Sequence, residues 1–250
     1  MRIRRILVSQ PEPNPGNSPY NDLAVKHNLK IDFRQFIQVE GVPAKDFRKD
    51  RIQILDHTAI IFTSRAAIDH FFRISQELRL TIPDSMKYFC ISEATAFYLQ
   101  KYIVYRKRKI FYANGKFADL VDVLMKHKED KFLIPLSDVH KDEIPTLLEK
   151  AKIQVTEAIM YRTVSADLSD LKEVNYDVLV FFTPVGIKSL MQNFPDFEQN
   201  ETKIATFGPA TAQAVRDAGL RLDVEAPIPE APSMPAALER FIAEWNKNNK

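Results

Sequence analysis

Residues 60–68 read IIFTSRAAI, and residues 180–187 read VFFTPVGI. In each stretch an apolar run ends in a threonine, after which a helical pattern begins. A second turn follows in each half, in SEATAFYLQKY at 92–102 and in FGPATAQAVRDAG at 207–219. Recurrence of this kind indicates an internal duplication, which decides the fold before any local pattern does. Two equal α/β units imply a cleft between them, to which both offer loop ends and helix N-termini.

Six short runs are apolar throughout, as parallel strands covered by helices on both faces should be. They lie at 4–9, 60–64, 88–92, 131–136, 178–183 and 204–208. Helical patterns alternate with them at 66–78, 94–102, 117–127, 142–151, 186–194, 211–219 and 235–247. This alternation predicts an α/β fold built from two doubly wound, flavodoxin-like domains with parallel sheets.

Two further segments, FRQFIQVEG at 33–41 and VTEAIMYRTVSA at 155–166, read as extended chain. If they pair, they form a two-stranded connector with strands at about 34–41 and 156–165. One domain is then discontinuous and joins residues 1–37 to 165–250, while residues 40–160 form the inserted domain. A thin connector permits relative motion of the domains, because few contacts cross it.

Composition excludes several functional classes. The net charge of +2 argues against a dedicated nucleic-acid binder, which should carry a clustered basic excess. The basic run YRKRK at 105–109 is short, and such a run is typical of a solvated surface or of charges that protect the edge of a sheet. The opening MRIRRILVSQPEPNP lacks the apolar core of a signal peptide, and no 18-residue apolar run exists. We therefore expect a cytoplasmic protein that binds neither nucleic acid nor membrane.

The single cysteine, Cys90, excludes an internal disulfide. It stands inside the apolar run KYFCIS, where we expect a small buried hydrophobe rather than a nucleophile. The five histidines show no metal-ligand spacing with one another, and a solvated surface role is expected for each. They are His27, His57, His70, His127 and His140.

The order of these stretches resembles the uroporphyrinogen-III synthase family over nearly the whole chain. The resemblance rests on PEP after the first strand, FTSRAAI, the second A-T-A turn, VTEAIMYRTV, the second FTP and FGPATAQAVRDAGLRLDVEAPIPEAPSMPAALERF. The last stretch is the most specific, since it is similar to the family's Ile-Gly-Pro-Thr-Thr-Ala segment and to the Ala-Glu-x-Pro-(Ser/Thr) stretch after it.

What the resemblance implies is a cyclising hydro-lyase without metal or organic cofactor. The family takes hydroxymethylbilane, a linear tetrapyrrole with eight carboxylates, and expels its terminal hydroxyl as water. It closes the ring with inversion of ring D, through a spiro intermediate, to give uroporphyrinogen III. A monomer that makes transient contact with the preceding pathway enzyme is expected.

A nearly neutral protein must hold this polyanion with local donors, namely helix N-termini, hydroxyls beside them and a few cations. The expected substrate-binding residues are Thr63, Ser64, Arg65, Ser92, Thr95, Ser137, Thr183, Pro184, Lys203, Gly208 and Thr211. Lys203 is included because the family has a lysine before the corresponding strand. The alternative is that the hydroxyl residues are ordinary helix N-caps.

Tyr161 is the expected catalytic residue, because it matches the family's tyrosine in the second connector strand. With an ordinary pKa near 10, its phenol stays protonated at neutral pH and can donate a hydrogen bond to the departing hydroxyl. The alternative is an amphipathic linker tyrosine.

At several positions the chain departs from the family pattern, and these departures leave fewer side chains that can donate hydrogen bonds to the substrate. Ala210 stands where a first threonine is usual, and Gln10 stands where an arginine is usual. Phe182-Thr183 replaces a Thr-Ser pair, and Leu136-Ser137 replaces a basic-Gly pair. Binding of the substrate carboxylates then depends more on four cations, Arg65, Arg162, Lys188 and Lys203. The alternative is that these four are ordinary solvated surface charges.

Two other functions are also open. One is a non-catalytic tetrapyrrole-binding or regulatory module, and the other is a two-domain sensor for another small anion.

Overall fold

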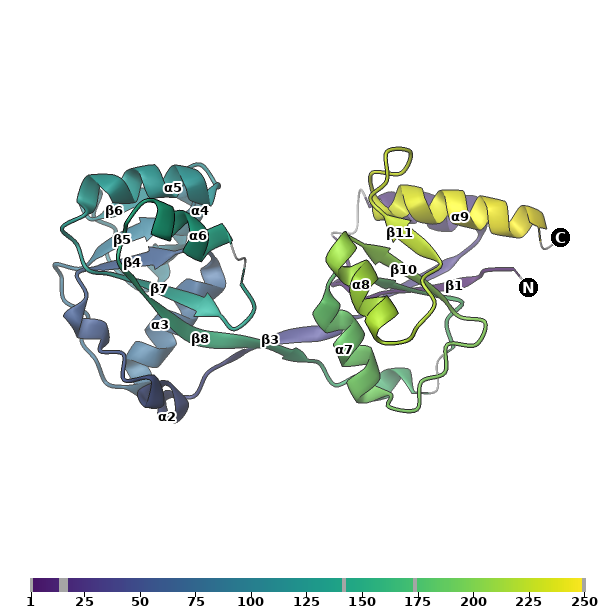
Figure 1. Ribbon diagram of the computed structural model, residues 1–250, viewed down its shortest axis with the longest axis horizontal. Helices are drawn as coiled ribbons and strands as arrows, with labels where there is room; N and C mark the ends of the chain where they lie inside the picture. Colours follow the sequence, from purple (N-terminus) through teal and green to yellow (C-terminus); the bar gives the residue numbers. More distant parts are fainter. Residues whose placement is uncertain (1, 14–17, 141–142, 173–174, 249–250) are drawn as a thin grey trace. The chain divides into compact units, whose positions relative to one another are not determined.

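The computed structural model describes residues 2–13, 18–140, 143–172 and 175–248. The chain divides into two compact units. Unit 1 comprises Met1–Gln38 and Val164–Lys250, and unit 2 comprises Val39–Thr163. Each unit is an α/β layer structure with its own parallel sheet (Figure 1).

Unit 1 contains a five-stranded sheet in the order β11-β10-β9-β1-β2. Its strands are β1 (Arg5–Val8), β2 (Lys30–Phe33), β9 (Val178–Phe181), β10 (Lys203–Phe207) and β11 (Val224–Ala226). Every neighbouring pair runs parallel. The carboxyl ends of the strands therefore meet at one edge of the sheet.

Helices cover both faces of this sheet. They are α1 (Pro19–His27), α7 (Pro184–Asn193), α8 (Pro209–Asp217) and α9 (Met234–Asn248), with the short 3-10 helix η5 (Ser169–Leu171). Ile6 and Val180 pack with α1 and α9 on one face, whereas Leu7 and Leu179 pack with α7 and α8 on the other. Figure 1 shows α9 on the side of the sheet opposite to α7 and α8.

Unit 2 contains a six-stranded sheet in the order β3-β8-β7-β4-β5-β6. Its strands are β3 (Ile37–Gly41), β4 (Ala59–Phe62), β5 (Lys87–Cys90), β6 (Ile110–Tyr112), β7 (Phe132–Ser137) and β8 (Val155–Ser165). The neighbouring pairs from β8 through β7, β4 and β5 to β6 are parallel. Here too the carboxyl ends of these strands lie at one edge.

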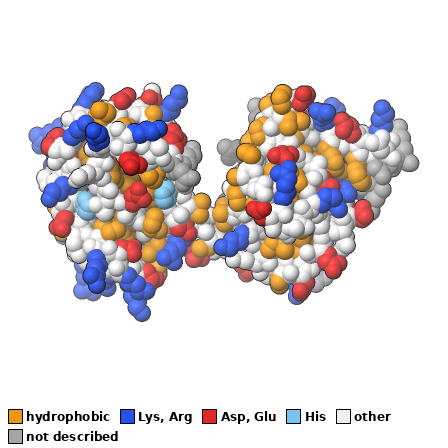
Figure 2. Space-filling view, viewed as in Figure 1, with side chains coloured by type: hydrophobic (Ala, Val, Ile, Leu, Met, Phe, Trp, Pro, Cys, Tyr) orange, Lys and Arg blue, Asp and Glu red, His pale blue; other side chains and the backbone are white. Residues whose placement is uncertain are grey.

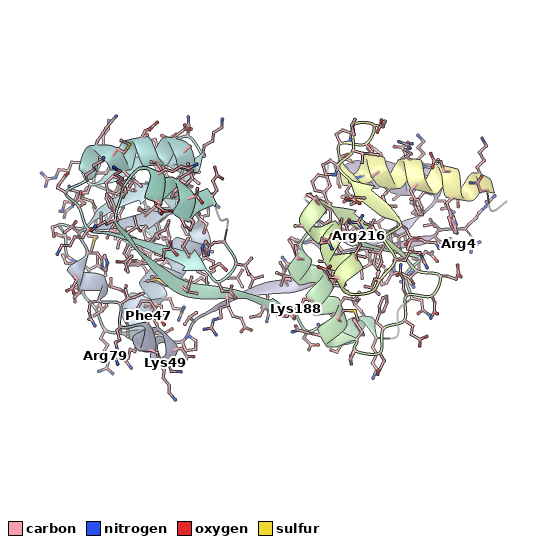
Figure 3. The ribbon with its side chains drawn as sticks, viewed as in Figure 1. Arg4, Phe47, Lys49, Arg79, Lys188 and Arg216 are labelled. Carbon is pink, nitrogen blue, oxygen red and sulfur yellow. The ribbon has the colours of Figure 1, made fainter. Side chains whose placement is uncertain are left out.

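The helices of unit 2 also form two layers. They are α2 (Ala44–Phe47), α3 (Arg65–Glu77), α4 (Glu93–Tyr98), α5 (Phe117–Leu124) and α6 (Glu143–Lys150), with the 3-10 helices η1 (Arg48–Asp50), η2 (Ile54–Asp56), η3 (Leu99–Lys101) and η4 (Met125–His127). Ile60 and Phe62 pack with α3 and α4, and Ala59 and Ile61 pack with α5 and α6. The short α2 buries Phe47, and Lys49 of the following η1 is exposed (Figure 3).

The predicted α/β fold with parallel sheets is confirmed, and its physical basis is visible in the strands. All four residues of β4 and of β9 are buried, because helices lie on both faces. Cys90 is fully buried in β5, as expected, and burial raises the pKa of its thiol to about 12. Among the described helices, none has the length and apolar composition needed to cross a bilayer.

Several elements lie outside the six runs and seven helical patterns named above. They are α1, α2, β2, β6 and β11, all short or only partly buried. The sequence of β2, KIDF, carries two charged residues among four, so it does not read as a fully apolar strand. The predicted helix at 142–151 begins at Asp142, which lies outside the described residues; α6 begins at Glu143.

The strands β3 and β8 carry the chain from one unit to the other. The boundary between the units falls between Gln38 and Val39 in β3 and between Thr163 and Val164 in β8. The two strands are neighbours at the edge of the sheet of unit 2. Beyond β3, the backbone N–H of Val42 donates to the carbonyl of Met160 over 3.0 Å.

A half-buried arginine on α3 fastens these two strands to unit 2. The Arg73 guanidinium donates to the carbonyl of Val42 over 2.8 Å and to the carbonyl of Met160 over 3.1 Å. It also pairs with Glu77, which in turn accepts the N–H of Ala44 over 3.0 Å. Gly41 makes room for this guanidinium, since a Cβ there would lie 2.5 Å from Cζ of Arg73.

We predict that Gly41→Ala destabilises unit 2 by about 1–3 kcal/mol, because the methyl group displaces Arg73 from charge-assisted hydrogen bonds. Urea denaturation of Gly41→Ala, Arg73→Ala and the double variant Gly41→Ala/Arg73→Ala measures the change in the free energy of unfolding. In the Arg73→Ala background the glycine substitution should cost much less. Equal costs in both backgrounds would show that Gly41 does not act through Arg73.

Candidate active site

The carboxyl edge of the sheet in unit 2 collects hydroxyl groups. Strands β4, β5 and β7 end at Phe62, Cys90 and Ser137, and each is followed by a turn. The residues that come next include Thr63 and Ser64 after β4 and Ser92 after β5. Parallel strands deliver their ends to one edge, which is where open α/β sheets bind ligands.

Ser64 caps α3. Its Oγ accepts the backbone N–H of Ala67 over 3.0 Å, so the N-cap alternative holds for this residue. A capping hydroxyl accepts through its oxygen and keeps its own proton free to donate. Arg65, the first residue of the helix, is exposed and lies over the ring of Tyr98 at 5.3 Å.

The turn after β5 repeats this arrangement. Ser92 caps α4 by accepting the N–H of Thr95 over 3.3 Å. The two side-chain hydroxyls are also hydrogen-bonded to each other over 3.0 Å. Thr95 is buried, whereas Ser92 is half-buried. Of the two hydroxyls, that of Ser92 is therefore the better placed to meet a ligand.

Ser137 and Tyr161 are partners in the register of β7 and β8. Ser137 is buried, and its hydroxyl donates to the Asp138 carboxylate over 3.0 Å. That carboxylate also accepts the backbone N–H of Thr163 over 2.9 Å. These hydrogen bonds hold the chain after β7 against β8, close to Tyr161.

The Tyr161 phenol lies among these groups. Its oxygen is 3.4 Å from Oγ of Ser64, and the residue is 8% exposed. Burial raises the pKa of the phenol, and the hydrogen bond with Ser64 opposes that rise only in part. Tyr161 therefore remains a neutral donor at neutral pH. Its ring stacks on that of His70, with centroids 5.0 Å apart and planes 17° from parallel.

In unit 1 the corresponding edge lies at the ends of β1, β9 and β10. Thr183 follows β9 and caps α7, with its Oγ1 accepting the N–H of Gly186 over 3.2 Å. Pro184 occupies the first turn of that helix, where its missing N–H costs nothing. A Cβ at Gly186 would lie 3.9 Å from Oγ of Ser9, which follows β1. The N-cap alternative holds for Thr183 as it does for Ser64 and Ser92.

The turn after β10 differs because its cap has no side chain. Gly208 caps α8 at φ 93°, a conformation that favours glycine. Thr211 lies in the first turn of α8 and is 2% exposed. Within the described residues no hydrogen bond from its hydroxyl is recorded, so Thr211 is not a capping residue. Unlike Ser64 and Thr183, it has no evident local structural role.

An apolar pocket of about 660 Å³ opens beside this edge. Phe182, directly after β9, and Phe207, at the end of β10, form part of its wall, with ring centroids 6.0 Å apart. Gln10, Tyr20 and Met234 contribute further lining. Phe182 is the residue that departs from the family's usual threonine, and here it supplies aromatic surface.

Lys203 is not brought to either edge. It is the first residue of β10, so it lies at the opposite end of that strand from Gly208. Its ammonium group is buried over the ring of Trp245 at 4.4 Å, with Glu201 at 3.9 Å. It lines a separate cavity of about 1200 Å³ together with Asp177 and Trp245. The structure thus separates Lys203 from the other expected binding residues of unit 1.

The remaining expected cations are surface residues. Arg162 and Lys188 are exposed, on β8 and α7 respectively. Figure 3 marks Lys188 on α7 and Arg216 on α8, and Arg216 is already paired with Glu225 over 2.6 Å. On the face shown in Figure 2, acidic and basic side chains are interspersed over both units.

All five histidines are half-buried, and several of them make specific contacts with neighbouring residues. His57 contacts Thr156 over 2.8 Å, and His127 packs on two phenylalanine rings. His127 also forms, with Glu129 and Asp130, a cluster whose potential ligand atoms lie within 4.8 Å of one another. The Lys87 ammonium donates to Asp130 over 2.7 Å, so this cluster already contains a cation.

Sequence reasoning missed two features of these edges. The stack of His70 on Tyr161 joins α3 to β8, and no local pattern reports such a long-range pair. The Phe182–Phe207 pair had a partial signal, since Phe182 departs from the family pattern, but Phe207 is the last residue of a different strand, β10.

Comparison with known proteins shows which family the chain resembles. The family described as Uroporphyrinogen-III synthase HemD matches residues 26–236. The uroporphyrinogen-III synthase of Saccharomyces cerevisiae is 28% identical over 127 residues, which cover 44% of this chain and 46% of the yeast protein. The chain thus spans about half the length of this curated relative.

A solved structure agrees in fold. The uroporphyrinogen-III synthetase of Helicobacter pylori aligns with a TM-score of 0.56 at 17% identity, covering 97% of this chain and 100% of that one. A mutant uroporphyrinogen III synthase from Thermus thermophilus aligns with a TM-score of 0.47 at 15% identity, over 96% and 99% of the two chains. The expected resemblance is confirmed, and the chain belongs to the uroporphyrinogen-III synthase family.

Proposed function

We propose that the protein is a uroporphyrinogen-III synthase, which cyclises hydroxymethylbilane with loss of water and inversion of ring D. The observation that carries the proposal is the position of Tyr161. In a chain of this family, a neutral phenol lies 3.4 Å from the Ser64 hydroxyl at the carboxyl edge of a parallel sheet. Such a group can assist the departure of a hydroxyl without forming a covalent bond to the substrate.

Recognition of the carboxylates is assigned to helix N-termini and to the hydroxyls beside them. The amino ends of α3 and α7 carry Ser64 and Thr183. The Thr183 proton is free to donate to a carboxylate, whereas the Ser64 proton is directed to the phenol oxygen of Tyr161. Partial positive charge at a helix N-terminus favours an anion by about 0.3–1 kcal/mol. Several such ends suit a ligand with eight carboxylates better than one basic surface would, and the interspersed charges of Figure 2 agree with this.

Recognition of the pyrrole rings is assigned to the pocket beside Phe182 and Phe207. Aromatic side chains bind a flat, electron-rich ring through offset or edge contacts worth about 0.5–1.5 kcal/mol per pair. The pocket volume of about 660 Å³ is of the size that holds a small organic group. Phe182, which stands where the family usually has a threonine, then offers the substrate an aromatic contact in place of a hydroxyl donor.

The chemical step follows from a neutral acid and a constrained substrate. Tyr161 donates a hydrogen bond and then its proton to the terminal hydroxyl, which leaves as water while the pyrrole nitrogen supplies electrons. Closure at the substituted carbon of ring D gives the spiro intermediate, from which the inverted ring arises. The proton that ring D loses when it regains aromaticity restores the phenol. Selectivity over direct closure then depends on how the substrate is held, since positioning contributes more than one hydrogen bond can.

Within this proposal the enzyme is a cyclising hydro-lyase of heme and tetrapyrrole biosynthesis that acts as a cytoplasmic monomer without a cofactor. Its substrate closes spontaneously, so transient contact with the preceding pathway enzyme would shorten its exposure to water. The alternative, a tetrapyrrole-binding module without turnover, predicts binding alone.

The product isomer tests the function directly. Purified protein is supplied with freshly made hydroxymethylbilane, and the oxidised products are separated into type I and type III uroporphyrin. Spontaneous closure gives type I, so we expect type III to dominate in proportion to enzyme. If only type I appears while the protein still binds the tetrapyrrole, the binding-module alternative is correct.

Thr211→Val tests the carboxyl edge of unit 1. Valine keeps the shape but removes a hydroxyl that makes no recorded bond in the described structure, so the free energy of unfolding should change by less than about 1 kcal/mol. We expect KM to rise severalfold in the steady-state assay. Unchanged kinetics together with a lower melting temperature would instead make Thr211 a structural residue.

Tyr161→Phe tests the edge of unit 2. Loss of one assisting hydrogen bond worth about 1.4–2.7 kcal/mol in the transition state should lower kcat by about 10–100-fold, with type III still the enzymatic product. Tyr112→Phe, at an exposed tyrosine of the edge strand β6, is the matched control. Wild-type kcat in Tyr161→Phe would remove the phenol from the mechanism.

A further inference from the structure

The partner of Tyr161 on its ring face is His70. The imidazole comes from α3 and lies nearly parallel to the phenol ring of β8, with centroids 5.0 Å apart and planes 17° from parallel. The phenol oxygen meets Ser64, the cap of the same helix, over 3.4 Å. One helix therefore contacts Tyr161 twice, through the hydroxyl and through the ring face.

Arg73 holds the imidazole in place. Its Nε donates to Nδ1 of His70 over 3.2 Å, while its guanidinium donates to the carbonyls of Val42 and Met160. Met160 is the residue before Tyr161. The arginine thus ties the imidazole to the backbone of the strand that carries the phenol, and it leaves His70 little freedom to turn away.

The hydrogen bond from Arg73 also defines the protonation state of His70. Because Nδ1 accepts a hydrogen bond from the guanidinium, the imidazole carries its proton on Nε2 and is neutral. Burial lowers the pKa of His70, and the positive charge of Arg73 lowers it further, while Asp69 opposes the change. The neutral form is therefore the one present at pH 7.

We propose that His70 is a positioning residue for Tyr161, whose ring it holds so that the phenol hydroxyl stays beside Ser64. The proposal rests on the proposed function, in which that hydroxyl assists the departure of water. His70 itself does not touch the reacting atoms. Its contribution is the orientation of the donor, which must be held within a fraction of an ångström for one hydrogen bond to act in the transition state.

Protonation of His70 should switch this support off. A proton on Nδ1 removes the acceptor that Arg73 uses and places two cations side by side. Among the described residues, the charged groups recorded as acting on His70 are Asp69 and Arg73 of α3, and Tyr161 faces it from β8. The supported state is the neutral one, so kcat should fall as the pH drops through the pKa of His70, below the usual 6.5.

Kinetics of three variants test the proposal. His70→Leu removes the flat ring, and kcat should fall about 5–30-fold with KM within about twofold, as expected when a transition-state interaction is lost. His70→Phe restores a ring that cannot titrate, so it should recover most of kcat and lose the acid limb of the profile. His127→Leu, which removes an imidazole packed on Phe89 and Phe111 instead, is the control and should keep both kcat and the acid limb.

A spectroscopic measurement separates failure of this proposal from failure of the proposed function. In proton NMR the Cε1–H resonance of His70, assigned from its loss in His70→Leu, should titrate below pH 6.5. The ring-current shift from the phenol should persist in Tyr161→Phe and vanish in Tyr161→Leu. If the wild type makes no type III product, the function fails while these shifts still test the stack. If type III forms and His70→Leu keeps the wild-type kcat and pH profile, His70 does not position Tyr161.

Discussion

The direction of the strands is the constraint on which the candidate site depends. When neighbouring strands run parallel, each one ends at the same edge, and each following helix begins there with unpaired N–H groups. In unit 2 this brings Ser64, Ser92 and Ser137 to one edge, and in unit 1 it brings Thr183 and Gly208 together. The chemistry of the edge then depends on which residue each turn supplies.

The two halves use this constraint with different residues. In unit 2 the helices α3 and α4 are both capped by serine, and Tyr161 lies at the same edge on β8. In unit 1 a threonine caps α7, whereas a glycine with positive φ begins α8 and leaves the Thr211 hydroxyl uncommitted. Two α/β units therefore present different carboxyl edges, one that carries a phenol and one that carries aromatic surface.

How much the sequence could predict follows from the range of each signal. Apolar runs and capping residues are local, so the parallel strands and most helices were predictable, whereas β2, with two charges in KIDF, was not. Lys203 was expected to bind the substrate, but the structure does not bring it to a carboxyl edge. A residue that begins a strand cannot reach the edge at which the strand ends. The stack of His70 on Tyr161 depends on how α3 packs on β8, which no short pattern encodes.

Ligand mapping by NMR tests the proposal that the tetrapyrrole binds at the carboxyl edges of the sheets. The isotope-labelled protein is titrated with uroporphyrinogen III kept reduced under nitrogen, and backbone amide shifts are followed. We expect the amides of Ser64, Ser92, Thr183 and Gly208 to move, while those of Ala59, Lys87 and Lys203, the first residues of their strands, stay in place. Shifts confined to the amino ends, or to the cavity beside Trp245, would contradict the account.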